Sequence, residues 1–122
     1  MSSPFPHQEA TSEAILEWRH YVAVPGRAER LLDRFHHHTL PLFREHGMKV
    51  VLFGTDAENE GHLHYVLAWP DRTAMEGCWQ TFAGDERWQR VRASSEADGP
   101  LIASIQRRVL DAVRFGATRV TG

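Results

Sequence analysis

The chain contains one cysteine, Cys78, which leaves no partner for an internal disulfide and excludes a zinc site built on cysteine pairs. It also lacks any apolar run approaching the ~18 residues that predict a membrane-spanning helix. The first residues, MSSPFPHQEATSE, have neither the basic start nor the apolar stretch of a secretory signal. These absences predict a cytoplasmic protein with no membrane partner.

An excess of charge of one sign is missing as well. The 14 lysines and arginines face 16 aspartates and glutamates, for a formal net charge of -2. Such a balance gives no general attraction to a phosphate backbone, so we expect no nucleic-acid partner.

The composition that is present fits one folded domain. Of 122 residues, 42% are hydrophobic and 25% are charged, which is ordinary for a globular protein. We predict a flexible N-terminal tail at residues 1–13, a single domain at 14–115 and a C-terminal tail at 116–122. One count stands out, because there are eight histidines and three of them are adjacent.

The hydrophobic residues alternate along the chain between the spacing of strands and that of helices. We predict strands and helices in the order β-α-β-β-α-β, over residues 15–24, 27–46, 48–55, 62–69, 71–83 and 101–110, with a short extra helix after residue 85. Pro41 lies inside the first helix and predicts a kink or a break there. This order is that of the α+β ferredoxin-like fold, in which helices cover one face of a four-stranded antiparallel sheet.

The first strand has two unlike faces. We expect Trp18 and His20 to lie on the face that meets the helices, since aliphatic residues flank them at the same spacing. Glu17, Arg19 and Tyr21 then lie on the opposite face. A second copy of the sheet would cover that semi-polar face, with Glu17 and Arg19 forming ion pairs across a homodimer interface.

Three short motifs in this order resemble those of the NIPSNAP family: EWRHY at 17–21 followed by Pro-Gly, LPLFREHG at 40–47, and DERWQ at 85–89. The resemblance covers about residues 15–110 and implies a homodimeric α/β barrel. The third strand, HLHYVLAW, departs from the family pattern and indicates a specialisation of this chain. Similar barrels serve as cofactor-free monooxygenases, polyketide cyclases, isomerases, haem-degrading enzymes and stress proteins, so the resemblance selects no single activity.

Histidines are the first candidates for chemistry. His20 and His64 lie on strands that are neighbours in this fold, so they could line one cavity and transfer protons near neutral pH. The alternative is that both are hydrogen-bonded core residues. The run of three, residues 36–38, is not expected to bind a metal, because its outer members point roughly 200° apart on a helix.

Aromatic residues are the candidates for binding a flat apolar ligand, although large aromatics also build the cores of small domains. The residues we predict to bind substrate are Trp18, His38, Phe53, Trp79 and Trp88.

We therefore predict a small enzyme that needs no cofactor and acts by proton transfer on a small apolar or aromatic metabolite, possible reactions being cyclisation, isomerisation, elimination and oxygenation. Two alternatives remain open. One is a non-enzymatic ligand-binding or stress-response protein of the same fold, and the other is a haem-binding protein with a histidine ligand.

Overall fold

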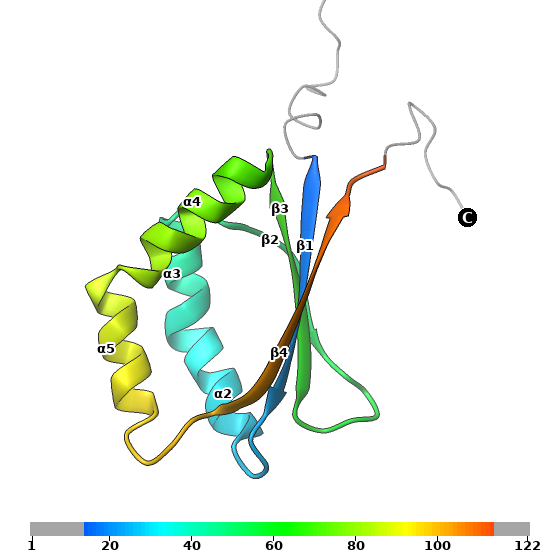
Figure 1. The fold of residues 1–122 in the computed structure, drawn as a ribbon. Helices are drawn as coiled ribbons and strands as arrows, with labels where there is room; N and C mark the ends of the chain where they lie inside the picture. The colour runs from blue at the N-terminus through cyan, green and yellow to red at the C-terminus, as the bar shows by residue number, and fades with distance from the viewer. Residues whose placement is uncertain (1–13, 114–122) are drawn as a thin grey trace, which may run out of the picture.

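The computed structural model describes residues 14–113, so the tails predicted at 1–13 and 116–122 lie outside the described residues. Within this range the chain forms four strands, four α-helices and one π-helical turn (Figure 1). In chain order they are β1 (Ile15–Ala23), α2 (Ala28–Arg34), η1 (Phe35–Thr39), α3 (Leu40–Glu45), β2 (Lys49–Thr55), β3 (His62–Trp69), α4 (Arg72–Ala83), α5 (Glu86–Ser95) and β4 (Ile102–Asp111).

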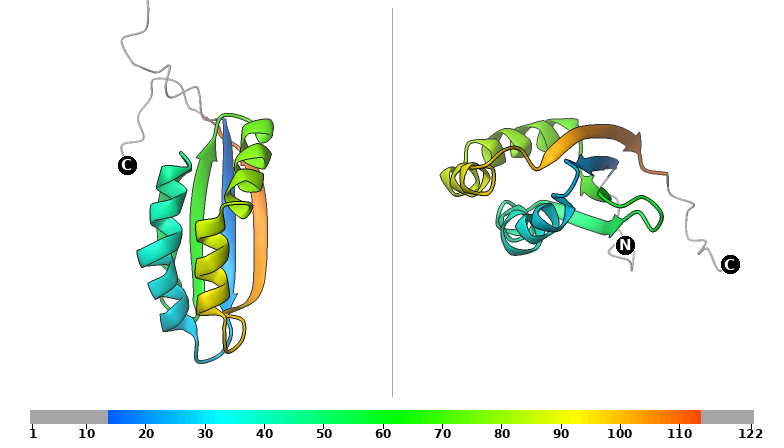
Figure 2. Two further views of the ribbon diagram at one scale, coloured as in Figure 1. Left: turned by 90° about the vertical axis from the view of Figure 1, so that its left-hand side faces the viewer. Right: turned by 90° about the horizontal axis from the view of Figure 1, so that it is seen from below.

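The strands form one antiparallel sheet in the order β2-β3-β1-β4. All helices lie on one face of this sheet, and no described element covers the other face (Figures 1 and 2). We call the two sides the helix face and the open face. The predicted ferredoxin-like arrangement is confirmed.

The face of β1 that meets the helices is the opposite of the one predicted from the sequence. Glu17 and Tyr21 are buried on the helix face, at 0% and 7% exposure, and Arg19 lies between them. Trp18 and His20 lie on the open face. The predicted assignment of the two faces was wrong, because apolar residues occupy both sides of this strand and cannot decide its orientation.

The first helical segment is continuous but changes its hydrogen bonding in the middle. Pro41 has no backbone N–H and its ring clashes with the carbonyl one turn back, so a regular α-helical turn cannot precede it. The turn widens instead into the π-helix η1, whose end is marked by the Leu40 N–H bonding to the Phe35 carbonyl. The predicted disruption near residue 39 is confirmed as a wide turn within one helical segment.

The core lies between the helices and the helix face of the sheet. Its most buried large side chains include Leu31, Phe43, Tyr65 and Met75. Among residues 14–113, no helix has the length and apolar character needed to cross a membrane.

Candidate functional site

A buried carboxylate organises the polar part of the core. Oε1 of Glu17 accepts hydrogen bonds from the indole N–H groups of Trp69 at 2.9 Å and Trp79 at 2.8 Å. Oε2 of Glu17 accepts from Nη1 of Arg19 at 3.1 Å and lies 3.7 Å from Nη1 of Arg107. A fully buried charge is tolerated only with such partners. Here all of these partners lie on the helix face of the sheet, as Glu17 does.

Arg19 links this carboxylate to a pair of tyrosines. Its Nε and Nη2 donate to the hydroxyl of Tyr21 at 3.2 and 3.1 Å, and its guanidinium lies 4.3 Å from the ring centre of Trp79. Burial by itself lowers the pKa of Arg19, but the neighbouring tyrosine hydroxyls and Glu17 outweigh it and the pKa rises above its usual range. Arg19 is therefore a permanent cation, held at the edge of the core with 14% of its side chain exposed.

The two tyrosine hydroxyls are hydrogen-bonded to each other, with 2.8 Å between the oxygen atoms of Tyr21 and Tyr65. Burial, supported by the nearby Tyr21, raises the pKa of Tyr65 well above its ordinary value even though Arg19 opposes the shift. The Tyr65 hydroxyl thus keeps its proton at physiological pH.

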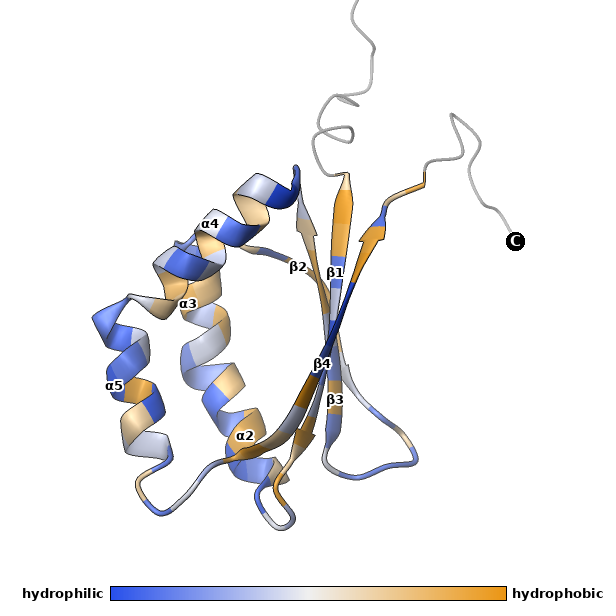
Figure 3. Cartoon of the chain, viewed as in Figure 1, coloured by the Kyte–Doolittle hydropathy of each residue, from blue (hydrophilic) through white to orange (hydrophobic). Residues whose placement is uncertain are grey.

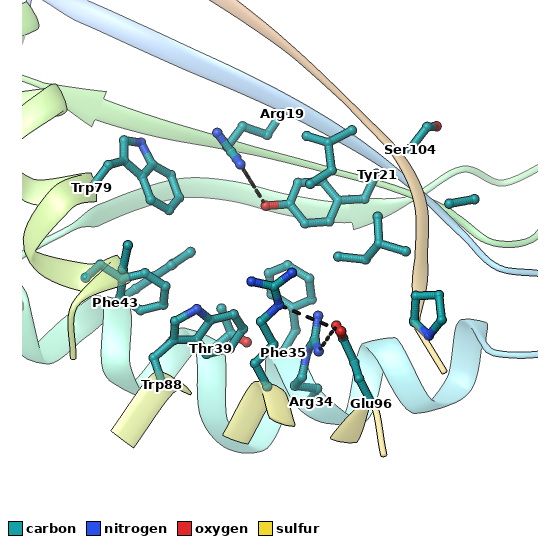
Figure 4. Close-up of a pocket in the computed structure, with 17 residues that line it drawn as sticks. Arg19, Tyr21, Arg34, Phe35, Thr39, Phe43, Trp79, Trp88, Glu96 and Ser104 are labelled. Carbon is teal, nitrogen blue, oxygen red and sulfur yellow. Dashed lines mark hydrogen bonds and ion pairs between the residues drawn. The ribbon is translucent and has the colours of Figure 1, made fainter. Parts of the chain in front are cut away.

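Tyr21 and Arg19 face a cavity of about 530 Å³ between the sheet and the helices, which we call the helix–sheet cavity (Figure 4). This volume lies in the ordinary range of ligand pockets, roughly 300–1,000 Å³. Its sheet wall consists of Arg19, Tyr21 and the start of β4. Its helix wall comes from α2, η1, α3, α4 and α5, and carries Arg34, Phe35, Thr39, Phe43, Trp79, Phe82, Trp88, Arg92 and Glu96.

The helix wall is mostly aromatic, with two arginines, Arg34 and Arg92. Arg34, whose side chain is 4% exposed, donates from Nη1 to Oγ of Ser95 at 3.0 Å and to Glu96 at 2.9 Å. Its guanidinium lies 5.2 Å from the ring centre of Trp88. Aromatic surface next to fixed cations on both walls suits a flat ligand that also carries polar atoms.

The predicted substrate-binding residues lie in four different places. Trp79 and Trp88 line the helix–sheet cavity, as a binding role requires. Phe53 stacks on Tyr65 at 5.8 Å and lines a different depression beside α2, η1 and α3. His38 lines another depression, between the α2–η1 segment and α5. Trp18 lies on the open face, so the structure does not bring the five residues into one site.

The two histidines predicted to be catalytic are neighbours, with 4.3 Å between the ring centres of His20 and His64. Trp18 stacks on His64 at 5.7 Å, and Nε2 of His20 lies 2.9 Å from Nδ1 of His62. This cluster lies on the open face, so the prediction that it lines a cavity beneath the helices was wrong. The catalytic role of the pair stays a prediction.

The residues that sequence reasoning missed are Arg19, Tyr21, Arg34 and Thr39. The first two were assigned to a dimer interface with Glu17, whereas the structure pairs Glu17 with Arg19 inside one chain. A signal was available in the motif EWRHY, since its first, third and fifth residues alternate with a period of two and share one face of a strand. No comparable signal marks Arg34 and Thr39.

Possible metal ligands do not converge in the part of the chain that the structure describes. No group of three histidine, cysteine, aspartate or glutamate side chains is placed to hold an ion there. In the histidine run, the rings of His36 and His37 stack with centres 4.5 Å apart. The helix–sheet cavity has no histidine among the described residues that line it, so a histidine-ligated haem finds no ligand inside it.

Comparison with known proteins agrees with this architecture. The NIPSNAP family model matches residues 16–117, which is most of the chain, and the protein belongs to this family. No curated protein matches the sequence.

Several solved structures share the fold at low sequence identity. A NIPSNAP-like domain protein from Burkholderia xenovorans superposes with a TM-score of 0.75 at 15% identity, covering 88% of this chain and 91% of that one. A NIPSNAP family protein of unknown function from Agrobacterium tumefaciens gives 0.73 at 15% identity, with 87% and 94% covered. A protein described as a putative antibiotic biosynthesis monooxygenase from Bacteriodes thetaiotaomicron gives 0.60 at 12% identity, with 91% and 99% covered.

Proposed function

We propose that this protein binds a small, largely aromatic metabolite in the helix–sheet cavity and acts on it by proton transfer without a cofactor. The observation that carries the proposal is the cavity itself, because it joins an aromatic lining to a tyrosine hydroxyl held by a partly buried arginine. The likeness in fold to a protein described as a monooxygenase of antibiotic biosynthesis is compatible with such chemistry and does not choose the reaction.

Tyr21 would donate a proton to the ligand and take one back. Its oxygen receives two N–H groups of Arg19 and lies 2.8 Å from the Tyr65 hydroxyl. Negative charge that appears on this oxygen, or on a ligand oxygen beside it, is therefore stabilised by a fixed cation. Trp79 and Trp88 would hold the ring of the ligand against this group.

The open face supports a homodimer as part of the proposal. Leu52 and Leu110 are exposed there to 53% and 46%, next to the cluster of Trp18, His20 and His64. Figure 3 shows how hydrophobic segments at the two ends of β4 flank a hydrophilic middle. A second copy of the sheet would cover these apolar groups and place the histidines at the interface.

Proton exchange into deuterated water tests the chemistry without knowledge of the substrate. Aromatic ketones with acidic C–H groups are incubated with the protein in D₂O, and deuterium incorporation is followed by NMR. We expect catalysed exchange that falls about 10²-fold or more in Tyr21→Phe, which keeps the ring and removes the hydroxyl. His20→Gln tests the rival prediction that the histidine pair on the open face carries the chemistry, and under the present proposal it should exchange at the parent rate.

Exchange that is equally fast in Tyr21→Phe would contradict the assigned role of Tyr21. Exchange lost in His20→Gln and kept in Tyr21→Phe would move the chemistry to the open face.

A non-enzymatic binding protein is the second candidate. It is favoured by the polar network, whose members already have hydrogen-bond partners without any ligand. Arg19 donates to Glu17 and to Tyr21, and the hydroxyl of Tyr21 bonds that of Tyr65. Tight binding of an aromatic probe in the cavity, without exchange in any member of a broad panel, would favour this candidate over the enzyme.

A further inference from the structure

Two buried polar atoms on the helix wall of the cavity have no hydrogen-bond partner. They are Nε of Arg34 and Oγ1 of Thr39, in residues that are 5% and 3% exposed. Leaving a buried donor without a partner is costly, and native proteins rarely do so where no ligand or water is bound. Both residues line the helix–sheet cavity, and less than 1 Å² of either atom is exposed, so a bound molecule reaches the two atoms when the side chains around them shift.

The wide turn η1 brings these two groups to the same wall. Arg34 is the last residue of α2 and Thr39 is the last residue of η1, so one π-helical turn separates them. Residues one turn apart lie on the same side of a helix. In Figure 4 both lie on the helix side of the cavity, across from Arg19 and Tyr21 on the sheet.

The charge of the lining favours an anion. Arg19, Arg34 and Arg92 contribute positive charge to the cavity, and Glu96 is the one acidic residue among the described residues that line it. Glu96 accepts a hydrogen bond from Nη1 of Arg34 at 2.9 Å and lies 3.7 Å from Nε of Arg92. It therefore balances only part of the positive charge of the two arginines. Nε of Arg34 stays unused by this carboxylate.

The chemistry of the two atoms defines the group that they would hold. An arginine N–H can only donate a hydrogen bond, and a threonine hydroxyl can also act as a donor. Two donors on one wall of the cavity, one of them part of a buried cation, suit a planar carboxylate, whose two oxygens can each accept from one donor. A neutral amide would offer one oxygen and turn its own N–H groups toward donors.

We propose that the ligand of the helix–sheet cavity is a small aromatic carboxylic acid, bound through its carboxylate by Nε–H of Arg34 and Oγ–H of Thr39. This assignment rests on the proposed function of the cavity and adds the chemical class of its ligand. The aromatic ring lies between the tryptophans of the helix wall, and the opposite end of the ligand meets Arg19 and Tyr21. The acid anchors the molecule and takes no part in proton transfer.

A pair of probes that differ in charge tests this assignment. Binding of 2-naphthoate and of 2-naphthamide is measured by calorimetry at neutral pH, where the first is an anion and the second is neutral. We expect the parent to bind 2-naphthoate about tenfold or more tightly than 2-naphthamide, since hydrogen bonds to a charged group are the stronger ones.

Thr39→Val keeps the shape of the side chain and removes the hydroxyl, and Arg34→Lys keeps the charge and removes the Nε donor. Each should lower the preference for 2-naphthoate several-fold and leave the affinity for 2-naphthamide within about twofold. Thr73→Val, at an exposed position of α4, is the matched control and should keep the preference of the parent. A melting curve of each variant shows that it is folded.

Equal affinity for the two probes in the parent would overturn the acid assignment and leave the proposed aromatic cavity standing. So would an undiminished preference for 2-naphthoate in Thr39→Val. Failure of both probes to bind at millimolar concentration would contradict the proposed function as well as this assignment.

Discussion

Replacing Glu17 tests whether its buried carboxylate holds the core together. Both indole N–H groups donate to Oε1, while Arg19 donates to Oε2. Glutamine with its oxygen toward the indoles keeps the first two bonds and turns its NH₂ group toward a guanidinium donor. Glu17→Gln therefore loses one charged hydrogen bond, and Glu17→Ala loses all three.

The size of each effect follows from these bonds. A hydrogen bond to a charged group contributes about 1.5–3 kcal/mol, and removing one partner of a buried ion pair costs about 3–5 kcal/mol. For a domain of this size, 1 kcal/mol shifts the melting temperature by roughly 4 °C. We expect Glu17→Gln to melt about 6–12 °C below the parent, and Glu17→Ala about 12–20 °C below it.

The melting temperatures are measured by circular dichroism. All samples have the same protein concentration, because the stability of a dimer depends on that concentration. Glu76→Gln, an exposed glutamate in α4, is the control and should stay within about 2 °C of the parent. Melting of Glu17→Gln within the same 2 °C would refute the reasoning, because the ion pair with Arg19 would then contribute nothing.

Three further predictions concern the histidine cluster, the helix wall and the open face. Burial and the charges of His20 and His62 lower the pKa of His64 in the folded protein, although Asp56 opposes this shift. Folding therefore disfavours protonation of His64, so stability falls as the pH drops through the ordinary histidine pKa of 6.5, and His64→Gln should flatten that part of the melting-temperature profile. In ligand-free protein Thr39→Val should raise the melting temperature by a few degrees, because its hydroxyl is buried without a partner, and a drop would contradict this. Sedimentation at micromolar concentration should give twice the chain mass of 13.9 kDa, and Leu110→Glu should shift it toward one chain; a single-chain mass for the parent would contradict the dimer.

The order of elements could be predicted from the sequence because each has a clear periodicity. The apolar spacing of the helices, the Pro-Gly turn after β1 and the polar turn between β2 and β3 all have local physical causes. The disruption near Pro41 follows from its missing N–H group. Only the structure shows that this disruption takes the form of a π-helical turn.

The orientation of β1 could not be decided in the same way. Its buried face carries Glu17 and Arg19, which are the residue types least expected in a core. They are stable there because Trp69 and Trp79, more than 50 positions away in the sequence, supply indole donors. Such long-range compensation leaves no local pattern, so the aliphatic neighbours of Trp18 and His20 misled the prediction.

The candidate site was predicted in part for a similar reason. Trp79 and Trp88 line the cavity because large aromatics on helices tend to face the sheet, which sequence spacing reveals. Arg34 and Thr39 matter because they are buried without full hydrogen bonding, and burial of that kind is visible only in three dimensions.

The position of a bound aromatic acid tests the central claim most directly. The four tryptophans give four separate indole N–H signals in a ¹⁵N spectrum: Trp18, Trp69, Trp79 and Trp88. On titration with 2-naphthoate, the signals of Trp79 and Trp88 should shift with one common saturation curve, because both side chains line the helix–sheet cavity, while the signal of Trp18 stays in place. A shift at Trp18 with Trp79 and Trp88 unchanged would place the ligand on the open face beside His20 and His64, and would contradict the account.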